Sequence, residues 1–137
     1  MKKTKRTLLC LMLAVLMVAS CALTAMAASG TSTVTVNGTE YTYRWTVTRG
    51  STSGTGTMAT QGTPAYLTVR VRNYLKSEEN DKEGYGAWAT NTGYSSVTAT
   101  ANNILKIGTV NVPSSVDYTD AEFDIGGTNV GSQSNVV

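Results

Sequence analysis

The sequence predicts an all-β fold, a small antiparallel β-sandwich or barrel of about seven strands that follows an N-terminal signal peptide. Three observations support this prediction. After position 27, 53 of the 110 residues are Thr, Ser, Gly or Asn, which suit half-exposed strands and turns. Polar and apolar residues alternate along several segments, as they do in strands with one buried face. Asn-Gly, the strongest short hairpin signal, stands between two such segments.

The first 27 residues have the pattern of a secretory signal peptide. A basic start, Lys2–Arg6, precedes the apolar run Leu8–Val18, and Ala25-Met26-Ala27 provides an Ala-x-Ala cleavage site. We therefore predict cleavage after Ala27 and a secreted protein with no membrane span after processing. The alternative is a lipoprotein anchored at Cys21, which ends a Val-Ala-Ser-Cys sequence. The apolar residues that follow this cysteine favour cleavage.

Residues 28–137 are predicted to form one secreted domain. They hold seven basic and nine acidic residues, so the net charge is −2 and no basic face for nucleic acid is expected. The chain has no histidine, and its only cysteines, Cys10 and Cys21, lie in the signal region. This composition excludes His-dependent triads, Cys–His dyads and the usual zinc sites. We expect a disulfide-free domain without a cofactor.

The first predicted element of the domain is a hairpin around Asn37-Gly38, whose type I′ turn pairs Val36 with Thr39. The second strand of this hairpin, Thr39–Arg49, alternates without a break. One of its faces carries three aromatic residues and a valine: Tyr41, Tyr43, Trp45 and Val47. We interpret the three aromatics as core residues because the valines of the first strand share their face. The alternative is a platform on which a sugar ring stacks.

The remaining elements follow from the same alternation and from turn residues. In chain order they are a connector over 51–62 with a short edge strand at 57–60, a long strand Ala65–Ser77, a charged loop Ser77–Gly86, a hairpin of 87–90 with 94–101, a strand over 104–112, and a last strand around Ala121–Ile125 that stops at Gly126-Gly127. The polar residues 128–137 are expected to form a frayed tail.

A candidate binding surface lies on the outward face of the long strand, where Tyr66, Arg70, Arg72 and Tyr74 alternate with apolar residues. Tyrosine and arginine are enriched at interfaces. The alternative is an ordinary solvated strand face.

Acidic residues form two further candidates. The charged loop offers carboxylates for calcium at Glu78, Glu79, Asp81 and Glu83, but it lacks the spacing of an EF-hand. We therefore expect a solvated loop and no metal site. Glu122 and Asp124 share a strand face and could in principle serve as the carboxylate pair of a glycosidase-like hydrolase. Catalytic pairs usually come from different segments that flank a cleft.

These observations favour a secreted, non-catalytic β module that binds a cell-surface glycan or protein. The first alternative is an antagonist of neighbouring cells. A signal peptide followed by a small, disulfide-free, Thr/Ser/Gly-rich β domain resembles in outline the lactococcin-type secreted bacteriocins. The second alternative is a hydrolase that uses its acidic residues.

Overall fold

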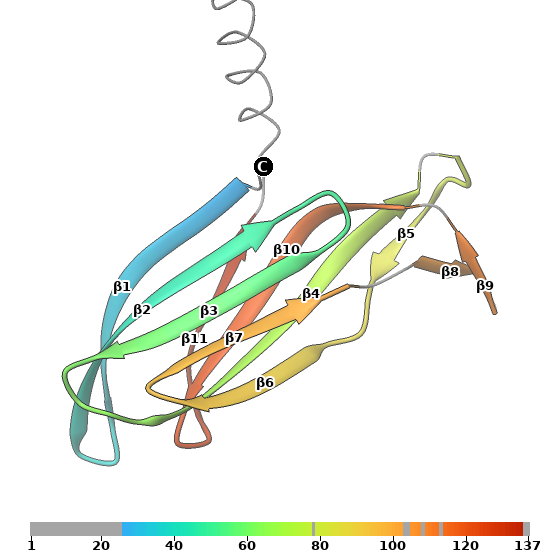
Figure 1. Cartoon of the computed structure of the whole chain (residues 1–137). Helices are drawn as coiled ribbons and strands as arrows, with labels where there is room; N and C mark the ends of the chain where they lie inside the picture. Colours follow the sequence, from blue (N-terminus) through green and yellow to red (C-terminus); the bar gives the residue numbers. More distant parts are fainter. Residues whose placement is uncertain (1–25, 78, 103–104, 108, 113, 136–137) are drawn as a thin grey trace, which may run out of the picture.

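The computed structural model describes residues 26–77, 79–102, 105–107, 109–112 and 114–135 (Figure 1). The predicted all-β fold class is confirmed, because these residues form eleven strands that pair in antiparallel fashion. Within these ranges no helix is long and apolar enough to cross a membrane. Residues 1–25, which make up most of the predicted signal peptide and include Cys10 and Cys21, lie outside the described residues. The predicted cleavage bond after Ala27 falls near the start of the first strand.

Two sheets face each other across the core. The first sheet has the strand order β1-β2-β3-β7, formed by β1 (Met26–Val36), β2 (Thr39–Arg49), β3 (Gly54–Gln61) and β7 (Ser96–Ala101). The second has the order β11-β10-β4-β5, with β6 also paired to β4; its strands are β4 (Tyr66–Ser77), β5 (Lys82–Tyr85), β6 (Ala89–Tyr94), β10 (Ser115–Ile125) and β11 (Thr128–Asn135). A separate two-stranded sheet contains β8 (Leu105–Ile107) and β9 (Val110–Val112).

The first hairpin forms as the sequence predicts. Asn37 and Gly38 have φ angles of 50° and 81°, the left-handed backbone that a type I′ turn requires. Val36 then pairs with Thr39, and Val34 with Tyr41. This register sends the valines of β1 and the aromatic residues of β2 to the same face of the first sheet.

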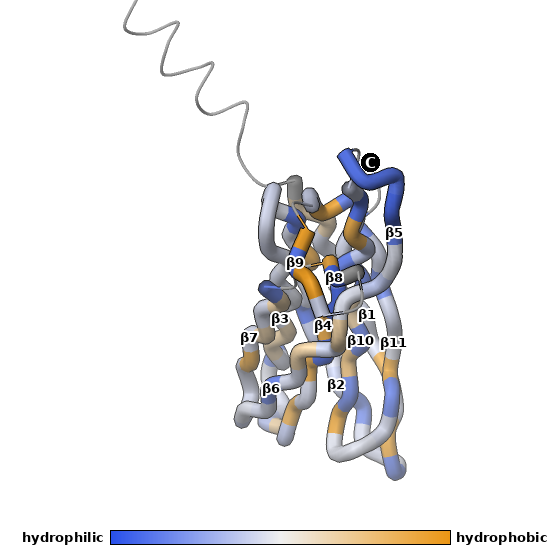
Figure 2. Tube along the Cα trace, turned by 90° about the vertical axis from the view of Figure 1, so that its right-hand side faces the viewer, coloured by the Kyte–Doolittle hydropathy of each residue, from blue (hydrophilic) through white to orange (hydrophobic). Residues whose placement is uncertain are grey.

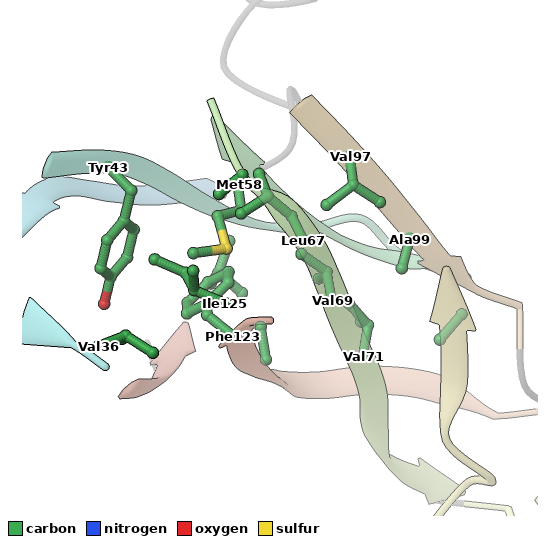
Figure 3. Close-up of a cluster of buried hydrophobic side chains, with 14 residues drawn as sticks. Val36, Tyr43, Met58, Leu67, Val69, Val71, Val97, Ala99, Phe123 and Ile125 are labelled. Atoms are coloured by element: carbon green, nitrogen blue, oxygen red, sulfur yellow. The ribbon is translucent and has the colours of Figure 1, made fainter. Parts of the chain in front are cut away.

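Apolar side chains from both sheets meet in one core. Phe123 of β10 is fully buried near the centre, and Met58 of β3 is fully buried opposite it. Figure 3 shows these side chains packing with Val69 and Ile125. The alternation predicted for β4 is confirmed, since its inward residues are buried from Leu67 to Leu75.

The three aromatic residues of β2 face this core to different depths. Tyr43 is buried, whereas Tyr41 and Trp45 are half-buried and pack against the core from its margin. The rings of Tyr43 and Trp45 each lie 6.3 Å from the ring of Phe123, measured between centroids. Trp45 also covers Gly30 on β1, where an added Cβ would approach the indole to 2.7 Å. The small neighbour therefore makes room for the ring on the inner face.

Asn73 is the polar exception on the inward face of β4, and it is fully buried. Its side-chain nitrogen donates to the Ala101 carbonyl at 2.9 Å. Its side-chain oxygen accepts from the hydroxyl of Thr119, also at 2.9 Å. Buried polar groups need such partners, and here the two bonds tie β4 to β7 and β10.

The predicted hairpin over 87–101 is wrong. β6 pairs with β4 in the second sheet, and β7 pairs with β3 in the first. Between them Ser95 has a φ of 63°, donates to the Ala65 carbonyl and accepts from the Thr60 amide. The chain therefore crosses from one sheet to the other at this corner.

Other expectations differ from the structure in extent. The segment expected as one strand over 104–112 forms the short pair β8 and β9, and the short strand expected at an edge is β3, which lies between β2 and β7. The charged loop contains β5, visible as a hydrophilic stretch in Figure 2. The expected frayed tail is instead β11, which pairs with β10 and ends on the buried Asn135. These additions raise the number of strands above seven.

Candidate functional site

The four surface residues predicted from the sequence, Tyr66, Arg70, Arg72 and Tyr74, lie on the outer face of β4. The residues between them are buried in the core, so these side chains point away from it. β4 has β10 on one side and β5 and β6 on the other. Tyr74 and Arg70 therefore have a paired residue on both sides. Arg72 pairs only with Asp120 of β10, and Tyr66 pairs only with Tyr94 of β6.

One row holds three tyrosines, Tyr85, Tyr74 and Tyr118, which we call the tyrosine triad. The rings of Tyr74 and Tyr118 are stacked, with centroids 4.9 Å apart and planes 3° from parallel. Tyr85 meets Tyr74 edge-on, with a centroid distance also of 4.9 Å. A 2.6 Å hydrogen bond joins the hydroxyls of Tyr85 and Tyr118. These contacts orient Tyr85, which remains half exposed.

Arginine and tryptophan side chains extend the triad. The guanidinium carbon of Arg72 lies 3.7 Å from the ring centroid of Tyr85 and 4.5 Å from that of Trp88. The guanidinium carbon of Arg70 lies 4.7 Å from the Trp88 centroid. Such cation–π contacts contribute about 0.5–1 kcal/mol each at exposed sites. Trp88 is thereby fixed over two adjacent arginines on the outer face.

Both arginines are also paired with carboxylates of β10. Arg70 forms an ion pair with Glu122 at 3.2 Å, and Arg72 forms one with Asp120 at 3.3 Å. Asp120 additionally accepts from the hydroxyl of Ser134 at 2.5 Å. Each guanidinium is therefore held between an aromatic ring and an anion, in a defined orientation.

A second aromatic group lies at the other end of β4. Tyr66 and Tyr94 are directly opposite each other on β4 and β6, and their exposed fractions are 60% and 68%. We call them the tyrosine pair. Large exposed apolar surfaces commonly mark interaction sites, and this pair lies on the same face as the triad.

The raised pKa values within the tyrosine triad give a testable prediction at alkaline pH. The hydrogen bond with Tyr85, together with desolvation, raises the pKa of Tyr118 to about 12. Desolvation and the nearby Glu83 raise the pKa of Tyr74 above its ordinary value. A raised tyrosine pKa means that the folded state favours the neutral phenol, so its stabilisation is complete below pH 10 and is lost as pH rises toward 12. We expect late-titrating tyrosines in an ultraviolet titration and a falling free energy of unfolding over this interval.

Replacing Tyr118 by Phe should remove the latest step and flatten that alkaline fall. Tyr41→Phe, on the other sheet, serves as the matched control and should leave the late step in place. Titration of all the tyrosines in a single step near their ordinary pKa would contradict the triad.

Among the described residues, the acidic candidates do not come together as a metal site. Glu78 lies outside the described residues. In the parts of the chain that the structure describes, no three carboxylate, histidine or cysteine groups gather around a common point. Of the proposed carboxylate pair, Glu122 contacts Arg70, and Asp124 accepts from the side chain of Asn129 at 3.2 Å. Both carboxylates thus serve contacts within the sheet.

Sequence reasoning missed three residues of this surface: Tyr85, Trp88 and Tyr118. Tyr85 ends β5, within a segment expected to be a loop, and Trp88 stands just before β6. Tyr118 follows a register shift in the pairing of β10 with β4. The alternation of Tyr118, Asp120 and Glu122 was a signal for an outward face, but no signal indicated which strand lies beside it.

Comparisons of the chain with protein-family models, with curated protein sequences and with solved structures found no match. The function is therefore inferred from the outer face of β4 and its neighbours.

Proposed function

We propose that the protein is a secreted, non-catalytic β module that binds a glycan or a protein on an extracellular surface through the outer face of β4. The observation that carries this proposal is the ordered cluster of Tyr85, Trp88, Arg70 and Arg72. Aromatic and arginine side chains dominate the energetics of binding surfaces. Because ring and ion-pair contacts already orient this cluster, less side-chain entropy is lost when a ligand docks.

The secreted location in this proposal rests on the signal-peptide pattern of the sequence. The non-catalytic character rests on the residue types available. The chain has no histidine, and three carboxylates of β10 on the outer face, Asp120, Glu122 and Asp124, are engaged with Arg72, Arg70 and Asn129. Those contacts support a binding role for the face over acid–base chemistry.

The test is surface retention of the mature protein. Labelled protein is incubated with intact producing cells and with their isolated walls, and the bound fraction is measured. Trp88→Ala should lower retention about tenfold or more, as expected for a central aromatic anchor. Arg44→Ala changes an exposed arginine on the outer face of the other sheet and should retain wild-type binding. Melting temperatures confirm that both variants fold.

Two outcomes decide the proposal. Wild-type retention by Trp88→Ala would place the binding surface elsewhere. If the wild-type protein binds neither the intact cells nor the isolated walls, the proposed function is overturned.

A further inference from the structure

The outer face of β4 has a nearly balanced charge. Its cations are Arg70, Arg72 and Lys76, and the anions at paired positions are Glu83, Asp120, Glu122 and Asp124. Both arginines already have carboxylate partners at 3.2 and 3.3 Å. A sulfated, phosphorylated or uronic ligand would have to displace those carboxylates and then lie beside them, which is electrostatically unfavourable. The face therefore suits an uncharged ligand.

Exposed aromatic rings stand at both ends of this face. The tyrosine triad lies at Tyr74 and the tyrosine pair at Tyr66, eight residues apart along β4. At about 3.3 Å per residue the two groups are separated by about 26 Å. A ligand that contacts both must be extended along the strand, as a polymer chain is and a small molecule is not.

Small hydroxyl side chains lie between Trp88 and the tyrosine pair. Thr68 pairs with Thr92, and Thr90 pairs with Arg70. Thr90 and Thr92 are exposed, so their hydroxyls are available to donate and accept hydrogen bonds. Rings that offer apolar faces, flanked by short hydroxyls, match the alternating C–H and O–H surfaces of a sugar polymer.

Resting on the proposed function, we propose that the ligand of this face is an uncharged polysaccharide that lies along β4 from the tyrosine triad to the tyrosine pair. The triad and Trp88 contact one stretch of the chain, and Tyr66 and Tyr94 contact another. The ion-paired arginines keep the intervening surface neutral and rigid.

The experiment measures retention of the mature protein on insoluble cellulose, chitin, mannan and starch, with heparin beads as the anionic comparison. We expect retention on at least one uncharged polymer, with little change from low to high salt because no counterions are released. Tyr66→Ala and Tyr85→Ala, at opposite ends of the face, should each weaken that retention about tenfold. Arg44→Ala should bind as the wild type does.

This inference is overturned by retention on none of the uncharged polymers, by salt-sensitive retention on heparin alone, or by an unchanged affinity of Tyr66→Ala for the polymer that binds. Protease treatment of intact cells separates this inference from the proposed function. Loss of Trp88-dependent binding after proteolysis identifies a protein ligand, which overturns the polysaccharide while the binding module stands. If the protein binds neither cells nor walls, both the proposed function and the polysaccharide inference are overturned.

Discussion

Replacing Phe123 by Ala is expected to lower the free energy of unfolding by about 3–5 kcal/mol, the usual range for removing a fully buried large aromatic side chain. Phe123 is fully buried in β10 and packs with the rings of Tyr43 and Trp45 from the opposite sheet. The variant leaves a cavity between two sheets whose strands are fixed by their hydrogen-bonded neighbours, so the space cannot collapse easily. Urea unfolding followed by tryptophan fluorescence measures the change.

The matched control is Tyr94→Ala, which removes a ring of similar size that is 68% exposed on the outer face. Its effect on the free energy of unfolding should stay within about 0.5 kcal/mol, as is usual for surface positions. Because small domains have only about 5–15 kcal/mol of stability in total, Phe123→Ala should also reduce the yield of folded protein. Equal effects of the two substitutions would mean that the two sheets do not pack around Phe123.

The elements predicted correctly from the sequence are those whose signals are local. Asn37-Gly38 determines its own turn geometry, and that turn determines the register of the two strands beside it. The strand Tyr66–Ser77 alternates over its whole length, and both of its faces were assigned correctly. In each case the information lies within about a dozen consecutive residues.

The elements predicted wrongly depend on distant contacts. Ser95 forms a corner because its backbone bonds to Ala65 and Thr60, neither of which is near it in sequence. The polar segment after Gly126-Gly127 has little apolar character of its own, yet it pairs with β10, and the side chain of Asn135 donates to the Val47 carbonyl at 3.1 Å. The two glycines have φ angles of 56° and 83°, so Gly-Gly was a readable hairpin signal.

The residues of the candidate site likewise fall into those that a local pattern predicts and those that only distant contacts place. The alternation of β4 predicts which of its side chains face outward, and the outward positions of Arg70, Arg72, Tyr66 and Tyr74 were predicted correctly. The rings that organise these residues come from other strands, and which strands lie beside β4 is a property of the topology. Trp88, which covers both arginines, had no local pattern to indicate its position.

Replacing Gly54 by Ala is expected to be destabilising out of proportion to one added methyl group. Gly54 is buried on β3 beneath the polar pair of Asn73 and Thr119. An added Cβ would approach the side-chain oxygen of Asn73 to 2.1 Å and the hydroxyl of Thr119 to 2.4 Å. Overpacking of a core usually costs about 1–3 kcal/mol. Displacing Asn73 also breaks buried hydrogen bonds, and a buried polar group left unpaired costs about a further 1–3 kcal/mol.

The matched control is Gly84→Ala on β5, where an added Cβ meets nothing within 4 Å and the backbone is not left-handed. Its change in the free energy of unfolding should be small, whereas Gly54→Ala should lose about 2 kcal/mol or more from these two effects. Hydrogen exchange of the backbone amides shows which strands are destabilised. The amides of β4, β7 and β10 around Asn73 should lose protection before those of the Asn37-Gly38 hairpin. A Gly54→Ala variant as stable as Gly84→Ala would show that Asn73 does not occupy the space beneath β3.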